Sequence, residues 1–249
     1  MSLRIRAYGE EPGLLALHCA LAHGGEWAGL GLPVIAPDLP GHGNSPEWVG
    51  TDYHTDCTRA VLKMMDQPMD VVGHSSGATI ALRVALERPE LVRTLTLIEP
   101  VLFAAARAAG SPAYADHLVR FAPVAQAFRE GDMMAAAAAF HAIWNAGAFA
   151  ALPPEMRASM AAHMPLIAAL NPALTDDTGG LLGPYRLESL GLPVLLLEGD
   201  RSPPVIAAIH DELARRLPQV TRAVVPGAAH MLPLTHTAEV RAAIAAHIA

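Results

Sequence analysis

Residues 73–77, with the sequence GHSSG, hold a serine between two glycines in the pattern G-x-S-x-G. An apolar run at 69–72 precedes them and a stretch of small and apolar residues follows. We therefore expect a tight turn from a strand into a helix, which would hold Ser75 in a strained backbone conformation beside the helix NH groups. Those NH groups could stabilise an oxyanion formed when Ser75 acts as a nucleophile. A phosphate-binding loop is excluded, because neither G-x-x-x-x-G-K-[ST] nor G-x-G-x-x-G is present.

A serine hydroxyl becomes a good nucleophile when a histidine accepts its proton and a carboxylate orients that histidine. Among the 12 histidines, His230 follows an apolar run at 220–225 and precedes the last helical stretch. A histidine in a loop is often only a solvated side chain. Here its position, and the chain order serine before histidine, favour His230 as the general base of Ser75.

The elements that must position these residues follow from the hydrophobic pattern. Strands are predicted at 3–8, 14–17, 34–36, 69–72, 91–98, 194–197 and 220–225. Helices are predicted at 53–65, 76–88, 205–217 and 237–248. Strands too apolar to alternate, separated by helices, indicate a mostly parallel sheet covered on both faces. The predicted fold class is therefore α/β, with a doubly wound sheet flanked by helices.

Between residues 103 and 185 the sequence becomes rich in alanine and takes a helical pattern interrupted by prolines. We interpret this part as a helical insertion over the sheet, with ordinary covering helices as the alternative. The predicted division is a core of residues 1–100 and 190–249 and a helical cap, or lid, of residues 101–189.

Large apolar side chains lie in this insertion and next to His230. They are Met133, Met134, Phe140 and Trp144, together with Met231. Such residues more often belong to a hydrophobic core than to a binding site. If Trp144, Phe140 and Met231 contact a substrate, an apolar acyl or small ring substrate would suit them.

Taken together, the motifs make the chain resemble the α/β-hydrolase fold family over nearly its whole length. The resemblance rests on His18 after an early strand, the turn 38–45 (DLPGHGNS), the turn around Ser75 and the segment 227–230 (GAAH). It implies a serine nucleophile, a histidine base, an acidic third member and a helical cap inserted near residue 100. The change of composition noted above begins at that place.

The same resemblance implies an oxyanion hole formed by the backbone NH groups of Ser76 and Ala20. Family members usually have glycine after the early histidine, whereas this chain has Cys19. The oxyanion loop therefore carries a side chain at that position. We expect Cys19 to be a buried small apolar residue rather than a redox or nucleophilic one.

The acidic member is absent from its usual place, three residues past the glycine at 199, where this chain has Ser202. Two substitutes remain, Asp200 and Glu99, of which Glu99 ends the predicted strand 91–98. Some members of the family that resemble this arrangement take their acid from that earlier strand end, where Glu99 lies. We favour Glu99 and keep Asp200 as the alternative, because shifting a carboxylate along a turn redirects it by more than the roughly 1 Å error that already costs rate. A structural Glu99 that only binds backbone or caps the insertion is the third interpretation.

Composition excludes several classes of function. The formal net charge of -7 gives no basic face for a nucleic acid, and no apolar stretch has the length of a membrane span or an export signal. Cys19 and Cys57 form no CxxC pair, which suits a reducing cytoplasm. Asp38 and His42 belong to a glycine-rich turn that we interpret as structural, and no metal or organic cofactor is expected. The expected partner is a small-molecule substrate, and the sequence leaves the oligomeric state open.

These inferences predict a cytoplasmic serine esterase that acts on a small ester-like or acyl substrate. Ser75 would form the acyl-enzyme, His230 would act as base and Glu99 would orient it. Carbon–carbon bond hydrolases and cofactor-free perhydrolases resemble esterases in all these motifs, so they are one alternative. A non-catalytic small-molecule binding protein is the other, and the absence of the usual acid is its best support.

Overall fold

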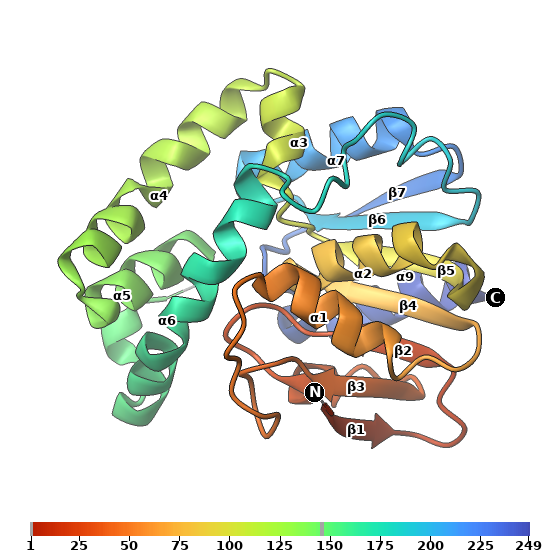
Figure 1. Ribbon diagram of the computed structural model, residues 1–249, viewed down its shortest axis with the longest axis horizontal. Coiled ribbons are helices and arrows are strands. Elements are labelled where there is room, and N and C mark those ends of the chain that lie inside the picture. Colours follow the sequence, from red (N-terminus) through yellow and green to blue (C-terminus); the bar gives the residue numbers. More distant parts are fainter. Residues whose placement is uncertain (1, 145–146) are drawn as a thin grey trace.

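The computed structural model describes residues 2–144 and 147–249, which form a seven-stranded sheet with helices packed against it (Figure 1). The strands are β1 Arg4–Tyr8, β2 Leu14–Leu17, β3 Val34–Asp38, β4 Met69–His74, β5 Val92–Ile98, β6 Val194–Gly199 and β7 Val220–Val225. Their order in the sheet is β1-β3-β2-β4-β5-β6-β7; β1 runs antiparallel to β3 and all other neighbours are parallel. Each predicted strand is present, and the α/β fold class is confirmed.

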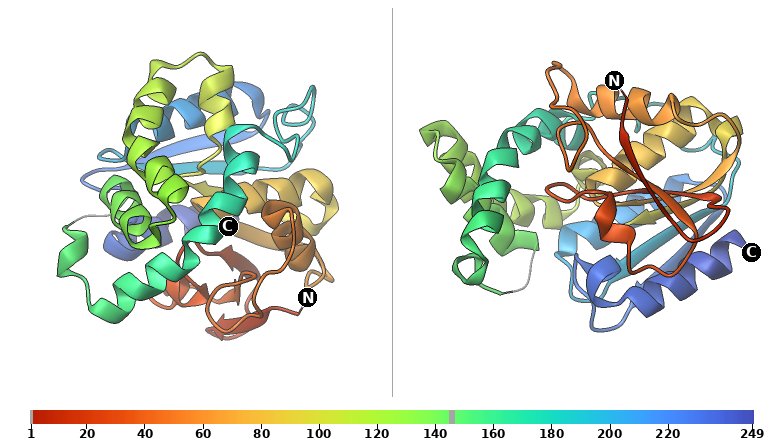
Figure 2. Two further views of the ribbon diagram at one scale, coloured as in Figure 1. Left: turned by 60° about the vertical axis from the view of Figure 1, so that its left-hand side comes forward. Right: turned by 90° about the horizontal axis from the view of Figure 1, so that it is seen from below.

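Helices cover both faces of this sheet, as the apolar strands predict. They are α1 Tyr53–Leu62, α2 Ser76–Glu87, α7 Pro204–Arg216, α8 Leu232–Thr235 and α9 Thr237–Ile248. In the right-hand view of Figure 2, α1 and α2 lie on one side of the strands and α9 lies on the other. Helix α1 is shorter than the predicted 53–65. The NH groups of Met64 and Met65 bond to the carbonyls three residues earlier, those of Val61 and Leu62, so the α-helical pattern ends there.

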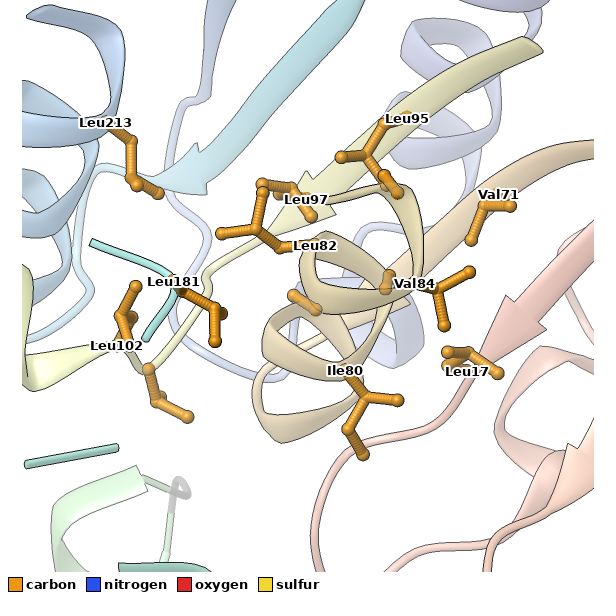
Figure 3. Close-up of a cluster of buried hydrophobic side chains, with 14 of the residues drawn as sticks. Leu17, Val71, Ile80, Leu82, Val84, Leu95, Leu97, Leu102, Leu181 and Leu213 are labelled. Carbon is orange, nitrogen blue, oxygen red and sulfur yellow. The ribbon is translucent and has the colours of Figure 1, made fainter. Parts of the chain in front are cut away.

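Neighbouring residues of the inner strands β2, β4, β5 and β6 enter two different hydrophobic cores. One core packs the sheet against α1, α2 and α7, and Figure 3 shows part of it, including Leu17, Val71, Leu82, Leu97 and Leu213. The other core packs the opposite face against α8 and α9 and includes Ala16, Val72, Ile98, Leu197 and Ile244. With both faces buried, these inner strands show mainly apolar runs instead of alternation, whereas the edge strands β1 and β7 are more exposed.

The remaining helices are α3 Phe103–Ala108, α4 Pro112–Glu130, α5 Met133–Trp144 and α6 Pro154–Thr175. Helices α4, α5 and α6 stand together beside the sheet, at the end where β4 and β5 finish (Figure 1). They share a core of their own, made by Val124, Ala127, Ala136, Ala137, Ala161, Met164 and Ile167. The helical character of the insertion agrees with the sequence pattern, and the cap boundaries at 101 and 189 stay a prediction.

The turn after β3 is organised around the carboxylate of Asp38. It forms an ion pair with Arg6 at 2.9 Å and accepts hydrogen bonds from the NH groups of Gly24 and Asn44. Burial would raise the pKa of Asp38, but these partners lower it to about 2. A side chain on Gly43, which has a φ of 55°, would collide with this carboxylate. The turn therefore has the structural role that the sequence suggests.

Within residues 2–144 and 147–249, no helix combines the length and apolar character that crossing a membrane requires.

Candidate active site

Ser75 lies in the turn between β4 and α2, with a φ of 56° and a ψ of −117°. Non-glycine residues seldom adopt such a conformation, and it persists only where the surroundings enforce it. Here the NH group of Ser75 donates a 2.9 Å hydrogen bond to the carbonyl of Ile98. A side chain on Gly73 would collide with the backbone of Gly77, and one on Gly77 would collide with the carbonyl of Leu17. Close packing therefore requires both glycines of the motif.

His230 lies between β7 and α8 and turns its ring towards Ser75. Its Nε2 is 3.0 Å from the Ser75 Oγ, although the two residues are 155 positions apart in the chain. The ring is buried, and burial lowers the pKa of His230 even though the neighbouring Glu99 raises it. The imidazole is therefore neutral near pH 7, which is the state that can accept a proton from Ser75.

Glu99 follows β5 directly and is fully buried, with a φ of 46°. Its Oε2 lies 2.6 Å from the Nδ1 of His230, and its Oε1 accepts hydrogen bonds from the Gly199 NH group, at 2.9 Å, and from the Ser202 hydroxyl. Burial would raise the pKa of Glu99, but His230 and these two donors hold it below its ordinary value. An ionised Glu99 fixes the proton of His230 on Nδ1 and leaves Nε2 free to face Ser75.

Asp200, the alternative acid, lies elsewhere. Its side chain is exposed, and its Oδ1 accepts a 2.7 Å hydrogen bond from the NH group of Gly227. Among the described residues it has no hydrogen bond to His230. Its bond to Gly227 stabilises the loop that carries this histidine. Ser202, at the position where the sequence resemblance led us to look for the acid, donates a hydrogen bond to Glu99. Of the two substitutes, the structure brings only Glu99 to His230.

Ala20 and Ser76 border one cavity together with Ser75. Ser76 is the first residue of α2, so its NH group belongs to the free N-terminal turn of that helix. Ala20 follows Cys19, whose carbonyl lies 2.7 Å from the Nδ1 of His18. The Nε2 of His18 accepts from Leu39, so Nδ1 carries the proton and donates it to Cys19. The carbonyl of Cys19 and the NH group of Ala20 belong to one planar trans peptide and point in opposite directions. The hydrogen bond from His18 therefore also orients the NH group of Ala20.

A second buried pair, Glu26 and His74, lies behind the serine turn and was not singled out from the sequence. The Nδ1 of His74 is 2.5 Å from Glu26 Oε1, and its Nε2 is 2.8 Å from the carbonyl of His230. The other carboxylate oxygen of Glu26 accepts the NH group of Cys19 at 2.8 Å. Burial lowers the pKa of His74, but Glu26 raises it above its ordinary value. The pair therefore links the loops of Cys19 and His230 to the residue before Ser75.

The sequence held one signal for this pair, an acidic residue beside Trp27 in a short loop between two buried strands. That signal does not identify His74 as the partner, because the two residues are 48 positions apart.

Cys19, Glu26 and His74 are also the group of described residues whose donor atoms lie close enough for a metal ion, within 4.8 Å of one another. Glu26 and His74 already satisfy each other by a hydrogen bond. Burial raises the pKa of the Cys19 thiol well above its ordinary value, which disfavours the thiolate that binds metals. The burial of Cys19 agrees with the expected small apolar role.

The three predicted substrate contacts, Trp144, Phe140 and Met231, all border a cleft of about 440 Å³ that opens over Ser75 and His230. The Trp144 ring is buried and lies 4.6 Å from the ring of His230. Its indole NH has no hydrogen-bond partner among the described residues, so a bound oxygen atom could satisfy it. Met133 and Met134, on the same helix as Trp144, do not border this cleft.

Comparisons with known proteins identify the family and the fold. A model of the alpha/beta hydrolase family matches residues 14–243. Lipase LipV of Mycobacterium tuberculosis is 34% identical over 113 residues, 41% of this chain and 43% of the lipase. The pimeloyl-[acyl-carrier protein] methyl ester esterase of Methylococcus capsulatus is 37% identical over 105 residues, 39% of this chain and 41% of the esterase. The chain thus spans about two fifths of the length of these curated relatives.

Among solved structures, the enol-lactonase from Burkholderia xenovorans LB400 superposes with a TM-score of 0.75. It is 18% identical, and the match covers 99% of this chain and 96% of the lactonase. At this identity the likeness concerns the fold alone.

The Glu26–His74 pair leads to a prediction about stability. We expect Glu26→Gln to lower the free energy of unfolding by about 1–3 kcal/mol near pH 6, because His74 loses its charged acceptor. The pKa of His74 is raised, so its contribution is complete below the ordinary value of about 6.5 and is lost as the pH rises through the raised pKa. The pKa of Glu26 is lowered, so its contribution is lost only as the pH falls through that lowered value. Urea unfolding should show a smaller difference between wild type and variant at pH 9 than at pH 6.

Glu90→Gln is the matched control, since the ion pair of Glu90 with Arg88 is exposed and contributes little. A Glu26→Gln effect of the same size at both pH values would contradict the charged pair.

Proposed function

The chain belongs to the alpha/beta hydrolase family, and from this membership and the contacts of Ser75 we propose that the protein hydrolyses esters through an acyl-enzyme. The observation that carries the proposal is the hydrogen-bonded series from Ser75 Oγ to His230 Nε2, at 3.0 Å, and from His230 Nδ1 to Glu99, at 2.6 Å. The names of the two curated relatives, a lipase and a methyl ester esterase, support an ester as the substrate.

In the first half-reaction, the Ser75 oxygen forms a bond to the ester carbonyl carbon while His230 Nε2 takes the serine proton. The bond between that carbon and the alcohol oxygen then breaks, and His230 returns the proton to the departing alcohol. In the second half-reaction, water gives a proton to His230 and its oxygen bonds to the acyl carbon. The bond from that carbon to the Ser75 oxygen then breaks, His230 returns the proton to Ser75, and the carboxylic acid leaves. Glu99 stays ionised throughout and stabilises the charged form of His230.

Negative charge develops on the carbonyl oxygen in both half-reactions. We assign its stabilisation to the NH groups of Ser76 and Ala20, which border the cavity next to Ser75. His18 supports this assignment, because its hydrogen bond to the Cys19 carbonyl orients the Ala20 NH group before substrate arrives. The cap of residues 101–189 is proposed to close over the same place, since Phe140 and Trp144 border the cleft from α5.

The nucleophile is tested with Ser75→Ala. We expect the wild type to hydrolyse p-nitrophenyl acetate and to be labelled by a fluorophosphonate. The variant should lose both, because Ser75 carries the hydroxyl that is hydrogen-bonded to His230. Ser189→Ala removes an exposed serine and should keep both properties. Labelling and turnover that survive in Ser75→Ala would refute the assignment. A wild type without either property would favour a binding protein.

The acid is tested by comparing Glu99→Gln with Asp200→Asn. Glu99→Gln should lower kcat by about 10⁴-fold, because an amide next to His230 favours the wrong tautomer. Asp200→Asn should stay within a few-fold of the wild type, since the Asp200 side chain accepts from the NH group of Gly227, a bond that asparagine can keep. Steady-state kinetics on p-nitrophenyl acetate measure both effects, and thermal unfolding confirms that each variant is folded. A larger loss in Asp200→Asn would exchange the two roles.

The acid limb of the pH profile follows from the pKa of His230. The base acts only when neutral, and its pKa is lowered by burial, so kcat/KM should fall with an apparent pKa below the ordinary value of about 6.5. Because Glu99 raises that pKa, the residual activity of Glu99→Gln should have its acid limb at a still lower pH. A limb above pH 6.5 in the wild type would contradict a buried neutral base.

A further inference from the structure

Two cavities of unequal size meet at Ser75. One is the open cleft of about 440 Å³ described above, and the other is a small cavity of about 30 Å³. Ala20, Ser75, Phe140 and Trp144 border both of them. An ester bound at Ser75 has two ends, an acyl group and an alcohol, and the two cavities offer a separate place for each.

The positions of His230 and Ser76 distinguish the two cavities. Of these two cavities, His230 borders the open cleft and not the small cavity. Ser76 borders the small cavity and not the open cleft. The alcohol must leave on the side of His230, because this residue returns the proton to the alcohol oxygen. The acyl group stays on Ser75, with its oxygen at the NH groups of Ala20 and Ser76. The alcohol therefore belongs in the open cleft, and the acyl chain in the small cavity.

The small cavity limits the length of the acyl chain. Its volume of about 30 Å³ is less than a tenth of the roughly 440 Å³ of the open cleft, so it suits only a short acyl chain. The walls come from Phe103 of α3 and from Ile167, Leu170 and Leu174 of α6, all of them buried. The Phe103 ring also stacks on His117 at 3.9 Å, which holds this wall in place. Walls this close together suit an acyl group as short as acetyl or propionyl.

The open cleft is suited to a much larger group. Its volume lies in the range of pockets that hold drug-sized ligands. Its outer lining is mainly apolar, with Leu152, Met156, Met160 and Leu234, and His141 adds a polar edge. Building on the proposed function, we infer that the preferred substrates are esters that join a short acyl group of two or three carbons to a bulky, mostly apolar alcohol.

A pair of isomeric esters tests the orientation with the wild-type protein. Benzyl acetate places the small group on the acyl side, and methyl phenylacetate places it on the alcohol side, while both release an alkyl alcohol. We expect kcat/KM to be at least tenfold higher for benzyl acetate, as differences of one or more methylenes in a pocket typically give about 10–200-fold. Equal rates, or a preference for methyl phenylacetate, would overturn the inference and leave the proposed function intact. No Ser75-dependent turnover of either ester would contradict both.

Chain length tests the wall of the small cavity. Across p-nitrophenyl acetate, propionate, butyrate and hexanoate, kcat/KM of the wild type should fall at least tenfold after propionate. Leu170→Ala should raise hexanoate turnover relative to acetate by about tenfold. Ile167→Ala enlarges the same cavity and is the second variant if Leu170→Ala does not fold, because the Ile167 side chain packs in the separate core of α4–α6. Met156→Ala, on the open cleft, should leave the acyl-length ratio unchanged. A flat series in the wild type, or the same change of ratio in Met156→Ala, would overturn the inference.

Discussion

The hydrogen bond between Glu99 and His230 is the interaction on which the rest of the site depends. A carboxylate without exposure to water is costly unless donors surround it. Glu99 receives donors from three separate places, which are His230 after β7, Gly199 at the end of β6 and Ser202 before α7. The contacts that keep Glu99 ionised thus also hold together the loops from which the site is built.

Backbone strain follows the same arrangement. Ser75 and Glu99 both have positive φ values, and they follow β4 and β5, which are neighbours in the sheet. The NH group of Ser75 donates to the carbonyl of Ile98, and that of Glu99 donates to the carbonyl of Leu197. Each unfavourable conformation is thus held by a hydrogen bond to the next strand, and both side chains are presented at the same end of the sheet. Glu26 and His74 add a second buried pair behind them.

The fold and the nucleophile could be predicted from the sequence because their signals are local. Apolar runs identify strands, and the two glycines of the serine turn are required by contacts within a few residues and with the neighbouring strand. The choice between Glu99 and Asp200 has no local signal in the sequence, since it depends on which of two loops lies next to His230 in space. Glu26 was missed, because an acidic residue in a short loop has no distinguishing mark until the fold places His74 beside it. Likewise, the sequence identifies Trp144 as a large aromatic residue but does not give its position against His230.

The contact between Ser202 and Glu99 has a consequence for the position of the acid. The Ser202 hydroxyl donates to Glu99, so a side chain at position 202 lies against this carboxylate. An acidic residue there would put two carboxylates in one buried place, and such neighbours share a proton instead of both ionising. One of the two would still be charged beside the histidine. This part of the site is therefore compatible with an acid that comes from the end of either neighbouring strand.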